Sequence, residues 1–168
     1  MADIFLSYAR KDKERASVFA SAFEALGWSV FWDPNILPGT PWDEVIEEEL
    51  HKCRCVVVLW SQASVRSRWV RNEAGVGDDR GVLVPVAIEQ VALPVAHRHR
   101  QVAELHDWRG NATDRAFAHL VAGIARVVPR AAARKIESLL SSSTPAAASP
   151  EVQVELSLVS RDVGPTFR

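Results

Sequence analysis

The chain has 168 residues, of which 20 are Lys or Arg and 21 are Asp or Glu, so its formal net charge at pH 7 is −1. This length suits one domain with a proper hydrophobic core and room for an appendage, while the near-neutral charge gives no electrostatic case for direct binding to nucleic acid or an anionic membrane. No apolar run approaches the roughly 20 residues of a membrane span, and no signal peptide pattern opens the chain, so we expect a cytoplasmic protein.

The two cysteines, Cys53 and Cys55, are separated by one residue. This spacing is too close for an easy disulfide, and no second pair completes a zinc site. We therefore expect reduced, half-buried thiols and no metal.

The first third of the chain alternates strand and helix patterns. The expected order is a strand at 3–8, a helix at 12–26, a strand at 28–32, a loop at 33–39 and a helix at 40–52. Asp12 is expected to cap the first helix and Gly27 to end it. Prolines and a glycine in 33–39 are typical of a loop rather than a continued strand.

The alternation continues after residue 52. The expected order is a strand at 55–60, a helix at about 64–79, a strand at 81–88, an irregular stretch to about 101, a short strand at 103–108 and a helix at 113–128. Pro85 indicates an irregularity in its strand, or a strand near a sheet edge. For the HRHR run at 97–100, a solvated basic loop is favoured over a metal or phosphate site.

Five strands that alternate with helices predict an α/β fold. The strands at 55–60 and 81–88 are apolar without alternation, which is typical of strands covered on both faces. We therefore predict a flavodoxin-like, five-stranded parallel sheet with helices on both faces.

Glu73 is the most informative residue of the chain. Helical spacing puts it on the inward face of its helix, one turn from Trp69. An inward carboxylate is costly unless it is paired, protonated or lining a cleft. One interpretation is an ion pair with Arg66 or another nearby base. The other is a ligand site, because the carboxyl ends of parallel strands bring residues 7–10, the 33–39 loop and the start of this helix around one crevice.

Other common site motifs are absent from the sequence. It contains no glycine-rich phosphate loop, no His/Cys metal cluster, no G-x-S-x-G elbow and no Ser-His-Asp order. The paired acidic residues of a CheY-like phosphoacceptor are also missing after the first strand, which disfavours that class of module.

Three segments resemble, in order, the motifs of TIR (Toll/interleukin-1 receptor-like) domains. Residues 3–8 (DIFLSY) resemble the first motif, and residues 36–39 (ILPG) resemble the second, the BB loop. The pattern Ser67-x-Trp69-x-x-x-Glu73 resembles the helix that carries the catalytic glutamate of NAD-cleaving TIR domains. The resemblance covers roughly residues 1–128 and is to the bacterial immune-effector type, although residues 89–101 match nothing in it.

This resemblance implies a TIR-type NAD⁺ nucleosidase that cleaves the nicotinamide–ribose bond, with Glu73 as its catalytic residue. The products would be nicotinamide and linear or cyclic ADP-ribose, and NAD⁺ would be a substrate, so no cofactor is expected. Self-association through TIR–TIR contacts would activate the enzyme in antiphage defence or immune signalling. A non-catalytic TIR–TIR interaction module, as in receptor adaptors, is the alternative.

The substrate-binding candidates lie at the carboxyl ends of the strands and around Glu73. They are Ser7, Arg10, Trp32, Asp33, Leu37 and Trp69. An aromatic such as Trp69 or Trp32 would stack on a ring, and Arg10 and Ser7 would suit the pyrophosphate. The alternatives are a strand-end hydrogen bond for Ser7 and an exposed helix-flanking charge for Arg10. Leu37, on a loop tip, is favoured as a contact to a neighbouring TIR domain, and Trp42 as a core or assembly residue.

The sequence changes character beyond residue 129. We expect a TIR domain at 1–129, then a helical extension and a flexible Ser-, Ala- and Pro-rich linker at 130–150. Within residues 151–168, Val152, Val154, Leu156 and Leu158 alternate with polar residues, which indicates a strand with no partner. We interpret them as the start of a further module, a C-terminal sensor missing from this chain, with a disordered tail as the alternative.

Overall fold

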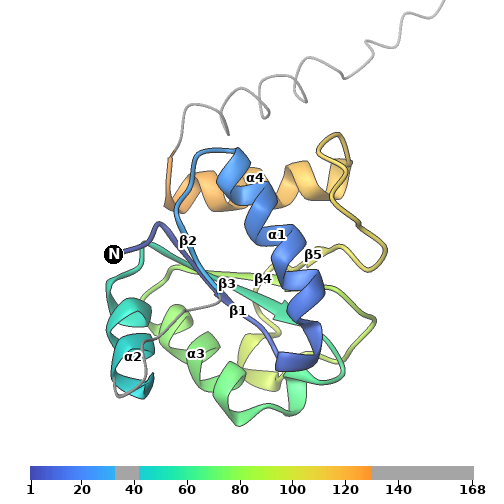
Figure 1. Ribbon diagram of the computed structural model, residues 1–168. Coiled ribbons are helices and arrows are strands. Elements are labelled where there is room, and N and C mark those ends of the chain that lie inside the picture. Colours follow the sequence, from blue (N-terminus) through green and yellow to red (C-terminus); the bar gives the residue numbers. More distant parts are fainter. Residues whose placement is uncertain (33–41, 130–168) are drawn as a thin grey trace, which may run out of the picture.

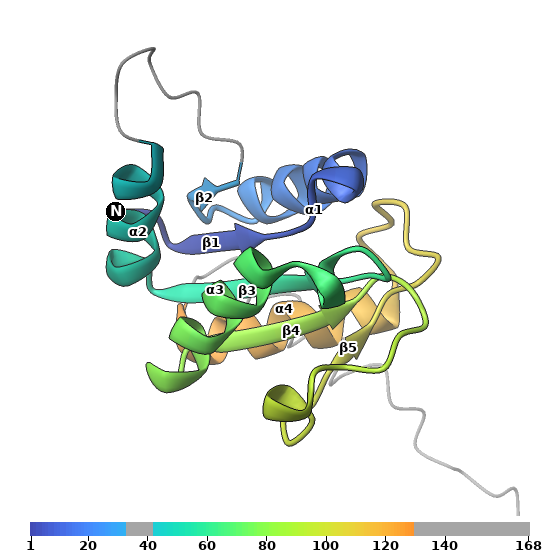
Figure 2. The same cartoon turned by 90° about the horizontal axis from the view of Figure 1, so that it is seen from below.

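A computed structural model describes residues 1–32 and 42–129, where the strands form a single parallel sheet in the order β2-β1-β3-β4-β5 (Figures 1 and 2). The strands are β1 (Ile4–Ser7), β2 (Val30–Phe31), β3 (Cys55–Trp60), β4 (Leu83–Ala87) and β5 (Ala103–Glu104). The predicted flavodoxin-like fold is confirmed. The 33–39 loop, with Asp33 and Leu37, and the two C-terminal units lie outside the described residues, as does the side chain of Trp42.

Helices cover both faces of the sheet, as Figures 1 and 2 show. They are α1 (Lys13–Ala25), α2 (Trp42–Lys52), α3 (Arg68–Asp79) and α4 (Arg115–Val127). Within the described residues, three short 3-10 turns join the elements: η1 (Arg10–Asp12), η2 (Ser64–Arg66) and η3 (Val95–His97). The apolar residues of α1 and α4 form one core with one face of the sheet, and those of α2 and α3 form a second core with the other.

The all-apolar β3 strand shows why this arrangement forms. All six of its residues are buried, and they alternate between the two cores: Val57 faces α1 and α4, whereas Val56 and Val58 face α2 and α3. Pro85 pairs with Val58 within β4, the strand next to the sheet edge, so the expectation of a near-edge position holds. The positive φ of Gly27, +89°, ends α1 as expected.

The predicted capping role of Asp12 is wrong. Asp12 precedes α1, but its side chain makes no capping hydrogen bond. Instead, the Ser61 hydroxyl beyond β3 donates to its carboxylate at 2.5 Å, and burial raises the pKa of Asp12. The physical reason is that η1 already turns the chain before α1, so Asp12 lacks the extended backbone of a helix cap and points at β3.

The expected solvated basic loop at 97–100 is wrong in part. His97 is 3% exposed, stacks on Trp60 at 5.8 Å and lies 3.2 Å from the Asp78 carboxylate at the end of α3. Arg100 Nε donates to the same carboxylate at 2.8 Å. Burial alone would raise the pKa of Asp78, but these hydrogen bonds lower it below its usual value. The run therefore holds residues 97–100 against α3, because Asp78, a half-buried carboxylate on that helix, contacts both His97 and Arg100.

Gly77 sets how closely α3 approaches the sheet. A methyl group at this position would lie 2.8 Å from Cβ of Val56 in β3, closer than real carbon contacts. We therefore expect Gly77→Ala to lower the free energy of unfolding by about 1–3 kcal/mol through overpacking. Gly75→Ala on the same helix meets nothing within 4 Å and should be neutral or stabilising by up to about 1 kcal/mol. Urea denaturation of both variants tests this, and equal effects would contradict it.

Candidate active site

The start of α3 positions the residues singled out in the sequence. The hydroxyl of Ser67 caps the helix and accepts a hydrogen bond from the Val70 N–H at 3.3 Å. Val70 and Ala74 are buried in the core between α3 and the sheet. This packing turns Glu73 inward, so that it is 5% exposed, and leaves Trp69 42% exposed one turn earlier.

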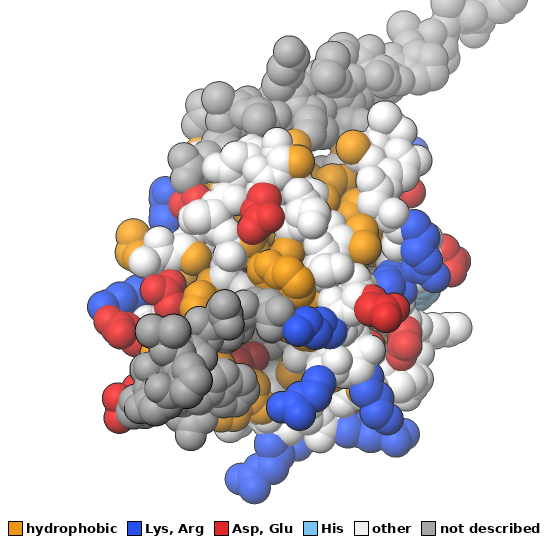
Figure 3. All heavy atoms as spheres, viewed as in Figure 1, with side chains coloured by type: hydrophobic (Ala, Val, Ile, Leu, Met, Phe, Trp, Pro, Cys, Tyr) orange, Lys and Arg blue, Asp and Glu red, His pale blue; other side chains and the backbone are white. Residues whose placement is uncertain are grey.

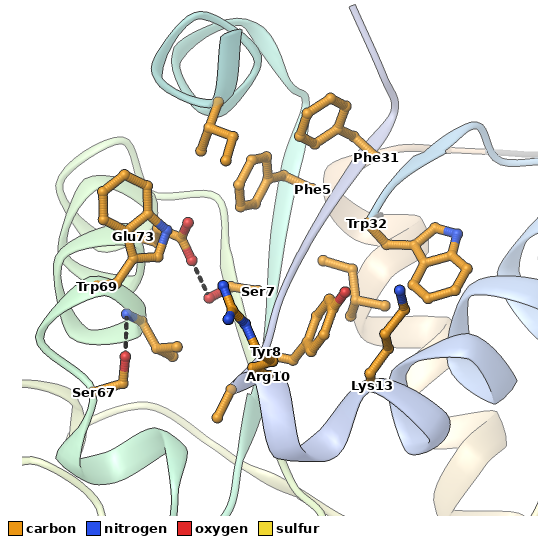
Figure 4. A pocket seen from close by; sticks show the side chains of 14 residues that line it. Phe5, Ser7, Tyr8, Arg10, Lys13, Phe31, Trp32, Ser67, Trp69 and Glu73 are labelled. Carbon is orange, nitrogen blue, oxygen red and sulfur yellow. Dashed lines mark hydrogen bonds between the residues drawn. The ribbon is translucent and has the colours of Figure 1, made fainter. Parts of the chain in front are cut away.

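Glu73 is a buried acid held by neutral donors. The Ser7 hydroxyl, at the end of β1, donates to Glu73 Oε2 (Figure 4). The Trp69 side chain also hydrogen-bonds the carboxylate. Burial raises the pKa of Glu73 from its usual 4.5 to about 7, and the two hydrogen bonds oppose that rise. No Lys or Arg among the described residues pairs with Glu73, so the ion pair with Arg66 is wrong; Arg66 is exposed in η2.

Glu73 opens into a pocket of about 640 Å³ at the carboxyl end of β1. Ser7, Arg10, Trp32, Trp69 and Glu73, all predicted from the sequence, line this pocket together. The structure therefore brings together every candidate that it describes, and Asp33 and Leu37 lie outside the described residues. Ser7 is 2% exposed, and its hydroxyl contacts Glu73 rather than only ending a strand.

Sequence reasoning missed several lining residues. They include Phe5, Lys13, Phe31 and Ile46. Phe5 and Phe31 stack on each other at 5.5 Å and form part of the apolar wall. Tyr8 lies within the 7–10 segment that was expected at the crevice, and it lines the pocket, although it was not named as a binding candidate. Lys13 had no comparable signal, because its approach to the pocket depends on the η1 turn that precedes it.

Figure 4 shows how the labelled side chains divide the pocket. Glu73 and Trp69 lie at one end, and Trp32, Tyr8 and Lys13 lie at the other. Ser7 and Arg10 lie between them. One end therefore carries a buried acid, while the middle and the other end carry cations.

Cations gather on the surface near η1 and the start of α3. Figure 3 shows Lys and Arg side chains gathered in the lower part of the view, where η1 and the start of α3 lie in Figure 1. Of the exposed cations in this region, Arg10 and Lys13 line the pocket. Such a surface raises the local concentration of anionic ligands and favours a phosphate-bearing molecule.

Within residues 1–32 and 42–129, no helix combines the length and apolar character that crossing a membrane requires. The same part of the chain holds no cluster of three or more His, Cys, Asp or Glu side chains that could bind a metal ion.

Comparison with known proteins gives one family. The family profile described as "TIR domain" matches residues 4–121. No curated protein sequence matches the chain.

Solved structures agree on the fold. The TIR domain of the Toll-related receptor TRR-2 from Hydra magnipapillata has a TM-score of 0.58 and 17% identity, over 64% of this chain and 86% of that one. A metazoan TIR-STING receptor from C. gigas in complex with 2′,3′-cGAMP has a TM-score of 0.61 and 24% identity, over 74% of this chain. Only 39% of that receptor is covered. At these identities, the likeness shows the fold alone.

Proposed function

The chain belongs to the TIR domain family, and on that premise we propose that it is an NAD⁺ nucleosidase that cleaves the nicotinamide–ribose bond. The observation that carries the proposal is Glu73, a buried carboxylate that opens into a pocket and has no cation partner among the described residues. A buried carboxylate without a cation partner lowers the stability of the fold. Such groups with strongly shifted pKa values are concentrated in active sites, where they take part in catalysis.

The chemistry of the reaction suits this carboxylate. Cleavage of the nicotinamide–ribose bond passes through an oxocarbenium-like state, as glycoside hydrolysis does. An ionised Glu73 would hold ribose hydroxyls and stabilise the positive charge that develops on the sugar. Trp69, whose ring lines the pocket one turn away, offers a surface for the nicotinamide ring.

Arg10 and Ser7 complete this proposed site. Arg10 is exposed and lines the middle of the pocket, where its guanidinium suits the pyrophosphate of NAD⁺. Ser7 donates its hydroxyl hydrogen to Glu73 and so opposes the rise of its pKa. Its role is to hold the carboxylate in place and favour the ionised form.

The wider setting is also a proposal. We expect self-association through TIR–TIR contacts to enclose the substrate, because Trp69 lies 42% exposed at the pocket. The cellular role would be antiphage or immune signalling in the cytoplasm, driven by a C-terminal sensor module. A non-catalytic adaptor is the competing function, and it gives no reason to keep a carboxylate buried at the base of a pocket.

The deciding experiment is an incubation of the purified domain with NAD⁺ at several protein concentrations, following free nicotinamide. We expect release of nicotinamide, with specific activity rising as the concentration increases. Asp79→Asn, which removes an exposed carboxylate from the end of α3, is the matched control and should retain full activity. An absence of nicotinamide at every concentration would favour the adaptor.

A further inference from the structure

The end of the pocket opposite Glu73 has its own chemical character. The Tyr8 and Trp32 rings lie 6.4 Å apart, tilted by 44°, and both are half-buried against the core of α1 and α4. The Lys13 side chain extends from the first residue of α1 toward the Trp32 ring (Figure 4). Two aromatic faces beside an ammonium group match a base joined to a phosphate, since bases stack on aromatic rings.

The order of charges along the pocket gives an orientation. Glu73 at one end would attract the positive nicotinamide riboside, Arg10 in the middle would attract phosphate, and Lys13 at the far end adds a second cation. A ligand placed in this order has its purine end at Trp32. The opposite orientation would put phosphate and purine against a buried carboxylate, which is unfavourable.

The size of the pocket agrees with a long ligand. Its volume of about 640 Å³ lies well within the roughly 300–1,000 Å³ of pockets that enclose drug-sized molecules. The lining runs from Glu73 on α3, past β1, to Trp32 after β2. The residues around Glu73 line only one end of this pocket, so the other end is left for a second part of the ligand.

We infer that Lys13, Trp32 and Tyr8 form a subsite for a nucleoside monophosphate, which binds the adenosine half of the dinucleotide. The purine stacks on Trp32, and the Lys13 ammonium donates hydrogen bonds to the adjoining phosphate. The identification of the ligand as NAD⁺, with its nicotinamide riboside half at Glu73, rests on the function proposed above. The subsite contributes binding and takes no part in bond cleavage.

Calorimetric titration of AMP tests the subsite without using activity. Lys13→Ala should weaken AMP binding about 10-fold or more, the effect of losing a hydrogen bond between charged groups. Lys11→Ala is the matched control, because Lys11 is exposed in the adjacent turn but does not line the pocket. Trp32→Leu should also weaken binding, and since Lys13 is exposed, its variant remains informative if Trp32→Leu is unstable.

Kinetics provide the second readout. Lys13→Ala should raise KM for NAD⁺ about 10-fold with kcat nearly unchanged, and should leave cleavage of nicotinamide mononucleotide, which lacks the adenosine half, unaffected. AMP binding that is absent, or equal in wild type and Lys13→Ala, would overturn the subsite even if NAD⁺ is cleaved. AMP binding that depends on Lys13, in a protein that cleaves no NAD⁺, would support the subsite and overturn the proposed function.

Discussion

Glu73→Gln should lower kcat for NAD⁺ cleavage at least about 10²-fold, a typical loss for a preorganised electrostatic group, while raising the Tm at pH 8. The loss of activity follows because an amide cannot supply the negative charge that opposes the developing oxocarbenium ion. The gain in Tm follows because the native protein buries an acid whose pKa is raised to about 7. Only a residue kept for function is expected to show both effects.

The sign of the stability effect comes from proton linkage. Between pH 4.5 and about 7, the folded protein holds a proton on Glu73 that the unfolded chain releases, so stability falls as the pH rises through this window. At about 1.4 kcal/mol per pH unit, burial of the ionised carboxylate costs on the order of 3 kcal/mol above pH 7. Glu73→Gln removes this cost at pH 8 and gives little gain near pH 4.

Thermal melts of wild type and Glu73→Gln at pH 4, 6 and 8 measure this effect, with Asp79→Asn as the control for loss of an exposed charge on the same helix. On the proposed mechanism, the wild-type protein should also show a kcat that increases as pH rises through about 7, because the ionised carboxylate stabilises the developing positive charge. A variant that melts lower than wild type at pH 8 would show that Glu73 is a structural partner. Full activity in the variant would remove it from the mechanism.

Periodicity was enough to predict much of this molecule. The unalternating apolar run of β3 indicated burial on both faces, and helical spacing on α3 turned Glu73 inward. The rule that ligands bind at the carboxyl ends of parallel strands then brought Ser7, Arg10 and Trp69 to one pocket. Strand burial, helix faces and strand ends follow from regular spacing along the chain, so they can be predicted from the sequence.

The misses are tertiary contacts that no local pattern encodes. Asp12 reads as a helix cap, but its carboxylate binds Ser61, 49 residues later. His97 and Arg100 read as a solvated loop, but Asp78 holds both of them. In each case the carboxylate is partly or wholly buried and needs hydrogen-bond partners. The partners come from residues that only the tertiary fold brings close, because an unsatisfied buried carboxylate costs more free energy than a local cap or a solvated loop would gain.

Trp69→Ala should lower kcat/KM for NAD⁺ roughly 30- to 100-fold, because it removes both a stacking surface and a hydrogen bond to Glu73. Trp69→Phe separates the two contributions, since it keeps a ring and loses the indole N–H. Both variants should move the midpoint of the pH–kcat profile upward, because the lost hydrogen bond no longer opposes the rise in the pKa of Glu73.

The increase in KM, by contrast, should be large only in the alanine variant. Trp69 is 42% exposed, so the Tm of both variants should stay close to that of wild type, which makes lost activity attributable to the site. Steady-state kinetics from pH 5 to 9, with thermal melts in the same buffers, measure all three quantities. An unchanged pH midpoint in Trp69→Phe would show that the indole N–H does not tune the carboxylate. A KM for Trp69→Ala equal to that of wild type would remove the ring from substrate binding, leaving Trp69 as a residue that acts only through Glu73.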